Sequence, residues 1–542
     1  MFSDPVVGNK FFGRNVPLTL FSKRVNGLKD GYRQNIAIIG PELIGKSSFV
    51  LHFFSQFKHP QIIPIYIDLR RNSFSHFIYK FLGTLLYQYL KNINFHLPQE
   101  FEALKEYAEK TVPQTVGDIR KVEECVKNSQ FDRAYESLLK LTAVLKEESG
   151  MSSIIILDEF HLLDSYKIRS PFSVFAKEIM MQKDTMYVLI SSQVSYAKRI
   201  FANELSLLFG NFEIIHLAPF DYKTSCEFLK KRFCDINLPQ NIRDFLIAES
   251  NGHPFYLDIL SNKLAEKAKE LNKSEITSIL LAEAFNSLIY DSKGILNQYF
   301  TNLIGQSLNG ADYSNFMPVL VSATTRAMSL ADISRTTKRR PKIVSRQVNS
   351  LLDKDLVGKV GTFYRIQDKI FRFWLKSVYH RKSLSLSVDP TSQSNDFSKE
   401  IEAQITRFSE ENKKELTERI SDLFKSFDNE IVVIQNKSSK FWRFEEVRPW
   451  LAKELDNCII ARYKDGYWAC LIKKEQITES EIQQFLHCCK SSKYKINKAI
   501  VVALEELDLN VRLAALEKKL WIWNLCDLKL LLDIYGKEQI VQ

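Results

Sequence analysis

Short apolar runs alternate with amphipathic segments along the first 220 residues of the chain. Runs of about four to eight apolar residues without polar alternation are typical of strands buried on both faces of a parallel sheet. Such runs lie at residues 36–39, 62–69, 153–157, 187–190 and 212–217. Residues 73–150 instead carry Phe, Leu and Tyr at helical spacing, which predicts a helical insertion between two strands. The pattern therefore predicts an α/β domain over residues 1–220.

The pattern changes after residue 220. Residues 221–310 have helical spacing, which we interpret as a small lid followed by a connector. Helical spacing at 315–324, 329–336 and 342–353 is followed by a hairpin pattern at 357–365, so residues 311–382 are predicted to form a winged helix-turn-helix. The Ser-rich residues 383–398 are interpreted as a linker. Strand and helix patterns then alternate over residues 399–542, which predicts a further α/β domain.

Composition limits the class of protein. At 542 residues the chain exceeds what one hydrophobic core can serve, so several domains are expected. The N-terminus lacks a basic stretch followed by an apolar run, and no stretch of about 20 apolar residues occurs, so we expect a cytoplasmic protein without a membrane partner. The eight cysteines lack paired CxxC spacing, which disfavours a zinc site or a disulfide framework. The net charge of +11 is compatible with a polyanionic partner.

The first predicted strand leads into a loop bracketed by glycines and then into a helix. The loop and the helix start read Gly40, Pro41, Glu42, Leu43, Ile44, Gly45, Lys46, Ser47 and Ser48. This spacing is typical of a P-loop, in which backbone N–H groups surround a phosphate. Lys46 would reach the β- and γ-phosphates, and the Ser47 hydroxyl would join a Mg²⁺ shell. A glycine-rich turn without a ligand is the alternative, but the flanking strand and helix favour a nucleotide site.

Two further predicted strands end in polar residues. Asp158 and Glu159 follow the run at 153–157, at the edge where open α/β sheets bind ligands. Asp158 would hold Mg²⁺ through water, and Glu159 would orient the attacking water. An acidic pair that only caps the strand is the alternative. Ser192 follows the run at 187–190, and we predict that it senses the γ-phosphate.

Two short motifs accompany this site: Phe11, Phe12, Gly13 and Arg14 before the P-loop, and Gly252, His253 and Pro254 in the predicted lid. With the P-loop and the Asp-Glu pair, they resemble the archaeal-type ATPase family, which lies between the AAA+ and STAND proteins. The resemblance implies an AAA+-like sheet with a helical lid, ATP and Mg²⁺ as ligands, and nucleotide contacts by Gly13, Arg14, His253 and Pro254. Asn211 stands where relatives commonly carry an Arg suited to a neighbour's γ-phosphate, so fast hydrolysis stimulated in trans is disfavoured. Substitution of that Arg by Lys198 or Arg199 is the alternative.

The predicted winged helix carries a basic turn and a basic helix face. Its basic residues are Lys338, Arg339 and Arg340 in the turn, Lys342 and Arg346 on the third helix, and Lys359 in the hairpin. The third helix of such a motif commonly lies in the major groove of DNA, and basic residues contact phosphates. We therefore predict binding of double-stranded DNA. A winged helix used for protein contact is the alternative.

The αβ order of the C-terminal residues resembles the restriction-endonuclease-like domain that often ends this family. In active relatives an Asp precedes an acidic-x-Lys triplet, and the two carboxylates hold Mg²⁺. Asp456 and Lys473 fit these places, but Leu471 stands at the acidic position. We therefore predict an inactive nuclease fold used for binding or assembly, with rescue by Glu475 or Asp465 as the alternative.

Three functions stay open from the sequence alone. The leading interpretation is an ATPase that acts as a nucleotide-driven switch coupled to DNA binding. A slow STAND-like switch that assembles proteins, by self-association or with a protein partner, is favoured by Asn211. A Mg²⁺-dependent nuclease gated by ATP is disfavoured by Leu471.

Overall fold

The chain divides into two compact units. The computed structural model describes residues 4–70, 73–93, 98–206, 210–308, 311–384, 389–450, 455 and 457–541. The first unit comprises Met1–Phe220 and His253–Phe255, and the second comprises Asp221–Gly252 and Tyr256–Gln542. None of the helices that the structure describes is both long and apolar enough to cross a membrane.

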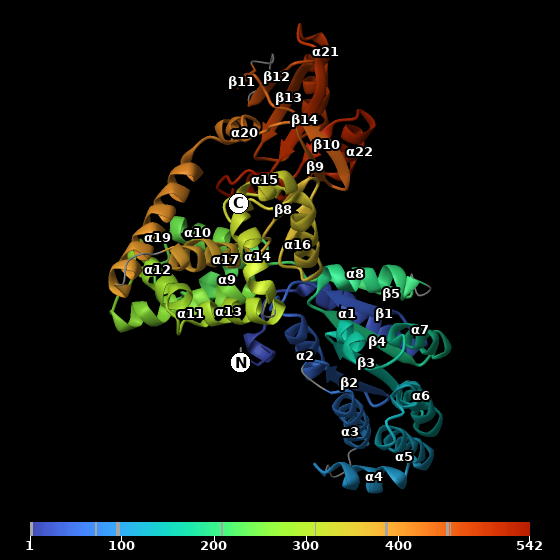
Figure 1. Ribbon diagram of the computed structural model, residues 1–542. Helices are drawn as coiled ribbons and strands as arrows, with labels where there is room; N and C mark the ends of the chain where they lie inside the picture. Colours follow the sequence, from blue (N-terminus) through green and yellow to red (C-terminus); the bar gives the residue numbers. More distant parts are fainter. Residues whose placement is uncertain are drawn as a thin grey trace. The chain divides into compact units, whose positions relative to one another are not determined.

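The first unit is built on a five-stranded sheet (Figure 1). Its strands are β1 (Asn35–Ile39), β2 (Ile62–Asp68), β3 (Ser152–Asp158), β4 (Thr185–Ser191) and β5 (Phe212–His216). All are parallel, in the order β2-β3-β4-β1-β5. The five apolar runs in the sequence therefore predicted the five strands correctly.

Helices cover both faces of this sheet, as the continuous apolar runs require. Ile36 and Ile38 of β1 pack with α1 (Asn15–Gly27) and α2 (Lys46–Gln56), whereas Ala37 and Ile39 face the opposite core. The connection from β1 to β2 crosses the sheet in one direction, and the later connections return in the other. Such a reversal opens a crevice at the carboxyl end of the strand where it occurs, here β1.

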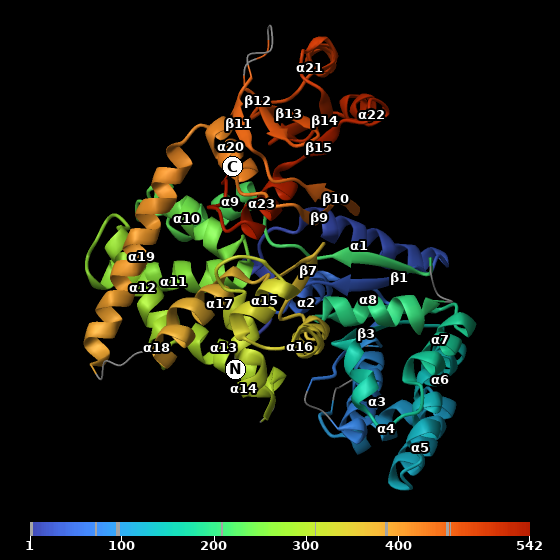
Figure 2. The same ribbon diagram turned by 45° about the horizontal axis from the view of Figure 1, so that its top comes forward.

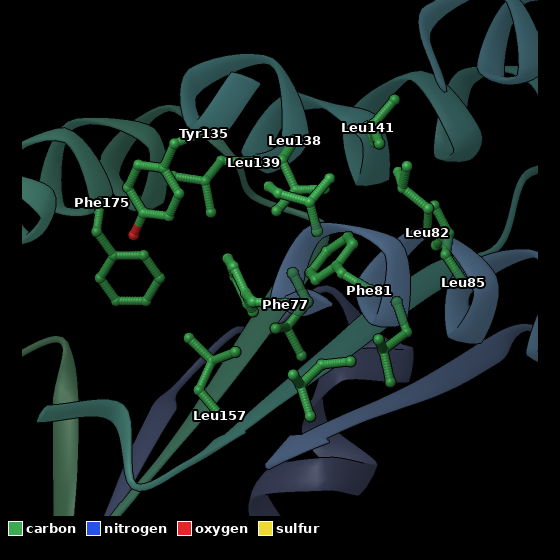
Figure 3. Packing of buried hydrophobic residues seen from close by; sticks show 14 of the residues in the cluster. Phe77, Phe81, Leu82, Leu85, Tyr135, Leu138, Leu139, Leu141, Leu157 and Phe175 are labelled. Atoms are coloured by element: carbon green, nitrogen blue, oxygen red, sulfur yellow. The ribbon is translucent and has the colours of Figure 1, made fainter. Parts of the chain in front are cut away.

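The predicted insertion between β2 and β3 is helical. It contains α3 (Phe74–Asn92), α4 (Phe101–Glu109), α5 (Pro113–Lys127) and α6 (Phe131–Ser149). Figure 3 shows Phe77 and Phe81 of α3 near Leu138 and Leu139 of α6, in the cluster that also contains Leu157 of β3. The insertion thus shares its core with the face of the sheet that α7 (Pro171–Met181) and α8 (Val194–Asn203) also cover.

The second unit begins with helices. These are α9 (Tyr222–Arg232), α10 (Gln240–Ser250), α11 (Pro254–Glu270), α12 (Ser278–Phe285) and α13 (Ile295–Ser307). Next come α14 (Ala311–Ser322), α15 (Leu330–Thr337) and α16 (Pro341–Asp353), with a small sheet of β6 (Met328–Ser329), β7 (Gly358–Val360) and β8 (Phe363–Arg365). Helices and a hairpin therefore form at the positions predicted for residues 311–365.

The linker predicted at 383–398 is wrong over its second half, because α19 spans Pro390–Lys413. Asp389 accepts hydrogen bonds from Thr391 N and Ser392 N, and Pro390 takes the first helical turn, so these polar residues start a helix. The helix continues because it buries an apolar stripe, and Phe408 packs edge-on to Phe245 of α10 at 5.5 Å between ring centroids. Residues 385–388 lie outside the described residues.

The rest of the second unit contains α20 (Leu416–Phe424), a hairpin of β9 (Glu430–Ile434) and β10 (Lys437–Phe441), and a five-stranded mixed sheet. The sheet order is β11 (Glu446–Pro449), β12 (Cys458–Tyr463), β13 (Gly466–Lys473), β14 (Ile496–Ala503) and β15 (Trp521–Trp523). Figure 2 shows α21 (Glu479–Ser491) and α22 (Leu509–Glu517) together beside this sheet. The other face packs with α20 and α23 (Leu525–Ile534).

A buried carboxylate joins three parts of the second unit. Asp533 of α23 pairs with Arg365 of β8, and its Oδ1 accepts from Arg372 Nη2 of α17 (Lys369–Trp374) at 2.6 Å. Burial alone would raise the pKa of Asp533, but Arg372 and Arg365 outweigh it and lower the pKa below its ordinary value. The hairpin of the small sheet is held in addition by Thr362 N, which donates to Ile431 O of β9 at 3.0 Å.

We predict that Asp533→Asn destabilises the second unit by about 3–5 kcal/mol near neutral pH, because it leaves Arg365 and Arg372 buried without their anion. The penalty should shrink as the pH falls through the lowered pKa of Asp533, where the wild-type carboxylate is protonated as well. Denaturant unfolding over a pH series measures this. The control is Asp422→Asn, which removes a half-exposed partner of Lys425 and should leave stability nearly unchanged. Equal effects of the two variants would contradict the prediction.

Candidate active site

The loop after β1 has the backbone of an anion cradle. Leu43 and Gly45 adopt positive φ angles of 58° and 96°, and Gly45 is the N-cap of α2. Gly40 lies so close to the backbone that follows β5 that a Cβ on residue 40 would lie 2.6 Å from Leu217 O. The loop thus turns its backbone toward the N-terminus of a helix of 11 residues, where an anion is favoured.

Lys46 lies inside this loop. Its side chain is buried, and Nζ donates to Pro41 O at 2.7 Å. Burial lowers the pKa of the ammonium group, and the charges of Glu159 and Asp158 oppose that effect. A buried ammonium that holds a loop carbonyl is placed to exchange that contact for phosphate oxygens.

Asp158 is a fully buried carboxyl group of the site. Its Oδ2 accepts from the Ser47 hydroxyl at 2.5 Å and also from the Tyr66 hydroxyl of β2. Its Oδ1 is buried and has no hydrogen-bond partner among the described residues. Burial raises the pKa of this carboxyl, and Glu159 raises it further. A buried carboxylate oxygen without a partner, beside a serine hydroxyl, fits Mg²⁺, which takes hard oxygen ligands.

Glu159 and Ser192 are in direct contact, although the sequence predicted separate roles for them. Glu159 has a positive φ of 57°, and its Oε2 accepts from Ser192 N and from the Ser192 hydroxyl, both at 2.8 Å. His161 Nδ1 lies 3.4 Å from the same carboxylate oxygen and 2.9 Å from Ser191 Oγ. Ser192 therefore holds one oxygen of Glu159 at the edge of the sheet.

The two accompanying motifs also lie beside the loop. Gly13 and Arg14 turn the chain with φ angles of 69° and 68°. The Arg14 guanidinium donates to Ala218 O and to Ile44 O, the latter at 3.2 Å, and burial lowers its pKa to about 10. It also lies 4.8 Å from the centroid of the Phe220 ring.

His253 reaches the loop from the start of α11, whose first residue is Pro254. The distance from His253 Nε2 to Glu42 O is 3.1 Å. Burial lowers the pKa of the imidazole to about 3, so it is neutral and donates to this carbonyl through Nε2. The Ser48 hydroxyl accepts a hydrogen bond from Val6 N at 2.9 Å.

Two further groups lie at this edge, Tyr66 and Arg70, and neither was predicted from the sequence. Tyr66 and Asp68 occupy alternate positions of β2, so they point to the same side as Asp158. Arg70 N donates to Asp68 Oδ1 at 2.9 Å, and the Arg70 guanidinium donates further hydrogen bonds to the same carboxylate. A hydroxyl and a carboxylate at alternate positions of an otherwise apolar strand end were the signal that could have revealed them.

The predicted DNA-binding residues differ in their exposure and in their contacts. Lys338, Arg340, Lys342 and Arg346 are exposed in the α15–α16 turn and on α16. Arg339 instead donates to Asn315 O and to Ser314 O, and so braces α14. Lys359 Nζ lies 5.6 Å from the centroid of the Tyr364 ring in its own hairpin.

The predicted nuclease site has no metal-binding geometry in the part of the chain that the structure describes. Leu471 is fully buried and pairs with Cys458 of β12, and Lys473 Nζ contacts Glu481 Oε1. Asp456 lies outside the described residues. Within the described ranges, no three His, Cys, Asp or Glu side chains lie together so as to hold a metal ion. Glu475 and Asp465 therefore do not complete a site with the residues that can be seen.

No protein-family model matches this chain, and no curated protein matches it. Several solved structures are similar. A Walker-type ATPase of Pyrococcus abyssi is 17% identical, with a TM-score of 0.49, over 69% of this chain and 99% of that chain. The ORC2 protein of Aeropyrum pernix is 11% identical, with a TM-score of 0.44, over 71% and 98% of the two chains.

The RuvB branch migration motor of Thermotoga maritima is 13% identical, with a TM-score of 0.33, over 69% of this chain and 98% of that chain. The neighbours thus include ORC-type and RuvB-type AAA+ P-loop ATPases. At identities and TM-scores this low, the function has to be inferred from the side chains of the site itself.

We predict that His253 makes the first unit sensitive to acid. The folded state keeps the imidazole neutral down to about pH 3, whereas the unfolded chain takes up a proton near its ordinary pKa of about 6.5, so stability falls as the pH drops between these values. In His253→Gln this loss should be smaller, which denaturant midpoints over the same pH range measure. His487→Gln, at an exposed histidine, is the control. Parallel pH profiles of wild type and His253→Gln would sink the idea.

Proposed function

We propose that the first unit binds and hydrolyses ATP with Mg²⁺. The observation that carries the proposal is the buried Asp158 carboxylate, whose Oδ1 has no partner among the described residues while Ser47 occupies Oδ2. Lys46 lies in the same loop, and Glu159, which follows Asp158, accepts a hydrogen bond from the Ser192 hydroxyl. A buried carboxylate oxygen that has no partner among the described residues supports a ligand at this position rather than a strand cap alone.

Different residues of the site bind the phosphates and the magnesium ion. The N–H groups of residues 42–48 and the Lys46 ammonium bind the β- and γ-phosphates, as the helix N-terminus and the loop carbonyl contact of Lys46 suggest. Ser47 and Asp158 would hold Mg²⁺, which when bound would supply charge that neutralises the phosphate oxygens.

Glu159 orients a water molecule and accepts its proton. The two hydrogen bonds from Ser192, which directly follows β4, fix the position of this carboxylate. Arg14 and His253 stabilise the loop by donating hydrogen bonds to Ile44 O and Glu42 O, respectively. They act as positioning residues, because each of these hydrogen bonds ends on loop backbone.

We predict that Lys46→Ala abolishes ATP binding, whereas Glu159→Gln keeps ATP binding and lowers turnover by about 10²–10⁴-fold. Gln preserves the shape and can still receive the Ser192 hydrogen bonds, but it does not accept a proton. Titration of a fluorescent ATP analogue and a phosphate-release assay separate the two effects. Glu147→Gln, at an exposed glutamate of α6, is the matched control. Unchanged turnover in Glu159→Gln would contradict the assignment of the base.

We further propose that the second unit couples the ATPase to double-stranded DNA. In this proposal residues 221–310 are the lid and connector, residues 311–382 are a winged helix, and the C-terminal restriction-endonuclease-like part is inactive. The supporting observation is the exposed face of α16, where Lys342 and Arg346 lie one turn apart while Val344, Gln347 and Val348 are buried.

A protein-assembly switch is the second candidate. The docking of the hairpin tip through Thr362 on Ile431 supports it, because a wing held by its own unit is less available to DNA. Asn211, whose backbone oxygen accepts from Asn35 N, supports it as well, since no guanidinium stands there for a neighbouring subunit.

We predict that Lys342→Ala/Arg346→Ala weakens duplex DNA binding regardless of sequence and lowers the salt-dependence slope by about 2, because each residue is expected to neutralise one phosphate. Fluorescence anisotropy at several salt concentrations measures both effects. The control double variant Lys399→Ala/Lys413→Ala removes the same charge from exposed positions of α19. An equal loss in the control, or DNA affinity unchanged in the first variant, would favour the protein-assembly switch.

A further inference from the structure

The end of β2 lies level with the proposed magnesium ligand. Strands β2 and β3 are parallel, and their register places Asp68 beside Asp158. Tyr66, two residues earlier on the same side of β2, already reaches Asp158 Oδ2. The residues that follow Asp68 therefore leave the sheet at the edge where the phosphates would lie.

Arg70 is fixed at this point by a bidentate contact. Its Nε donates to Asp68 Oδ1 at 3.0 Å and to Oδ2 at 3.1 Å, and its Nη2 donates to Oδ2 at 2.9 Å. About half of the side chain, 49%, is exposed. Among the described residues, no hydrogen bond uses Nη1. The guanidinium is thus oriented through Nε and Nη2, and Nη1 is left to contact a ligand.

The charge of Arg70 acts on the groups of the active site. Burial raises the pKa of Asp158, and Arg70 is among the groups that oppose this rise. The pKa of Arg70 is raised by its hydrogen bonds to Asp68 and further by the charges of Asp158 and Glu159. Burial lowers the pKa of Lys46, and Arg70 adds to that effect. The guanidinium therefore shares one electrostatic environment with the three groups proposed to bind and cleave ATP.

We propose that Arg70 is a catalytic residue that contacts the γ-phosphate of ATP bound to the same chain. The proposal rests on the ATPase function proposed above. In phosphoryl transfer the charge of the transition state spreads over three oxygens, and a guanidinium held nearby stabilises it. Arg70 would supply this group in cis, and Asp68 would hold it in place so that little side-chain entropy is lost on contact.

The experiment compares Arg70→Ala and Arg70→Lys with wild type and with Arg120→Ala. Arg120 is a matched control, because it also makes a bidentate contact, with Glu109 in the helical insertion, at 2.6 and 2.7 Å. Thermal unfolding first shows whether each variant is folded. The readouts are kcat and KM for ATP, and separate affinities for ADP and for a non-hydrolysable ATP analogue.

We expect Arg70→Ala to lower kcat by about 10²-fold or more, within the scale of an arginine contact to the γ-phosphate. ADP affinity should stay within about threefold, since ADP lacks that phosphate, while affinity for the ATP analogue falls toward the ADP value. Arg70→Lys should recover part of the binding but not kcat, because an ammonium cannot make the fork contact with Asp68. Arg120→Ala should behave as wild type.

Two results would overturn the role of Arg70. One is a kcat in Arg70→Ala within about twofold of wild type; the other is an equal loss of ADP and ATP-analogue affinity, which indicates a structural role only. Failure of the ATPase proposal looks different. A wild-type protein that binds nucleotide without turnover rejects hydrolysis, and the ratio of the two affinities then still decides whether Arg70 reads the γ-phosphate.

Discussion

The buried carboxylate of Asp158 is the constraint on which the first unit depends. An anion is held inside a sheet by two hydroxyl groups that meet on one oxygen, while the other oxygen is left without a partner among the described residues. Burial raises its pKa, so the anion alone is unfavourable and a divalent cation at this point would relieve the cost. In the proposed function, binding of a ligand at this position would offset the electrostatic cost of the buried carboxylate.

The sheet order explains why these groups meet. Lys46 and Ser47 follow β1, Asp158 and Glu159 follow β3, and Ser192 follows β4, which lies between the other two. Because all five strands are parallel, their carboxyl ends form one edge, and the reversal of the crossovers at β1 leaves space above it. The glycine at position 40 is needed for the same reason, since the chain at Leu217 closes over the loop.

Periodicity in the sequence was enough to predict the strands of the first unit and the loop after β1, because uninterrupted apolar runs report burial on both faces. It did not predict that α19 begins at Pro390, because the first residues of this helix are polar and were interpreted as part of a linker. It also missed Tyr66 and Arg70, which matter through the register of β2 against β3. The contact of Ser192 with Glu159 likewise depends on the register of β3 against β4 rather than on spacing along the chain.

The docked hairpin of the second unit limits how a DNA contact can be made. Gly361 adopts a positive φ of 64° at the hairpin tip, and the place of a Cβ there is taken by Ile431 O. Asp533 holds the base of the same hairpin through Arg365, so both ends are fixed within the unit. With this hairpin held, the proposed DNA contact would fall to α16 alone, and its exposed Lys342 and Arg346 would contact phosphates rather than base edges. Binding of that kind is salt-sensitive and tolerant of sequence, which suits a switch that responds to the presence of DNA and not to a particular site.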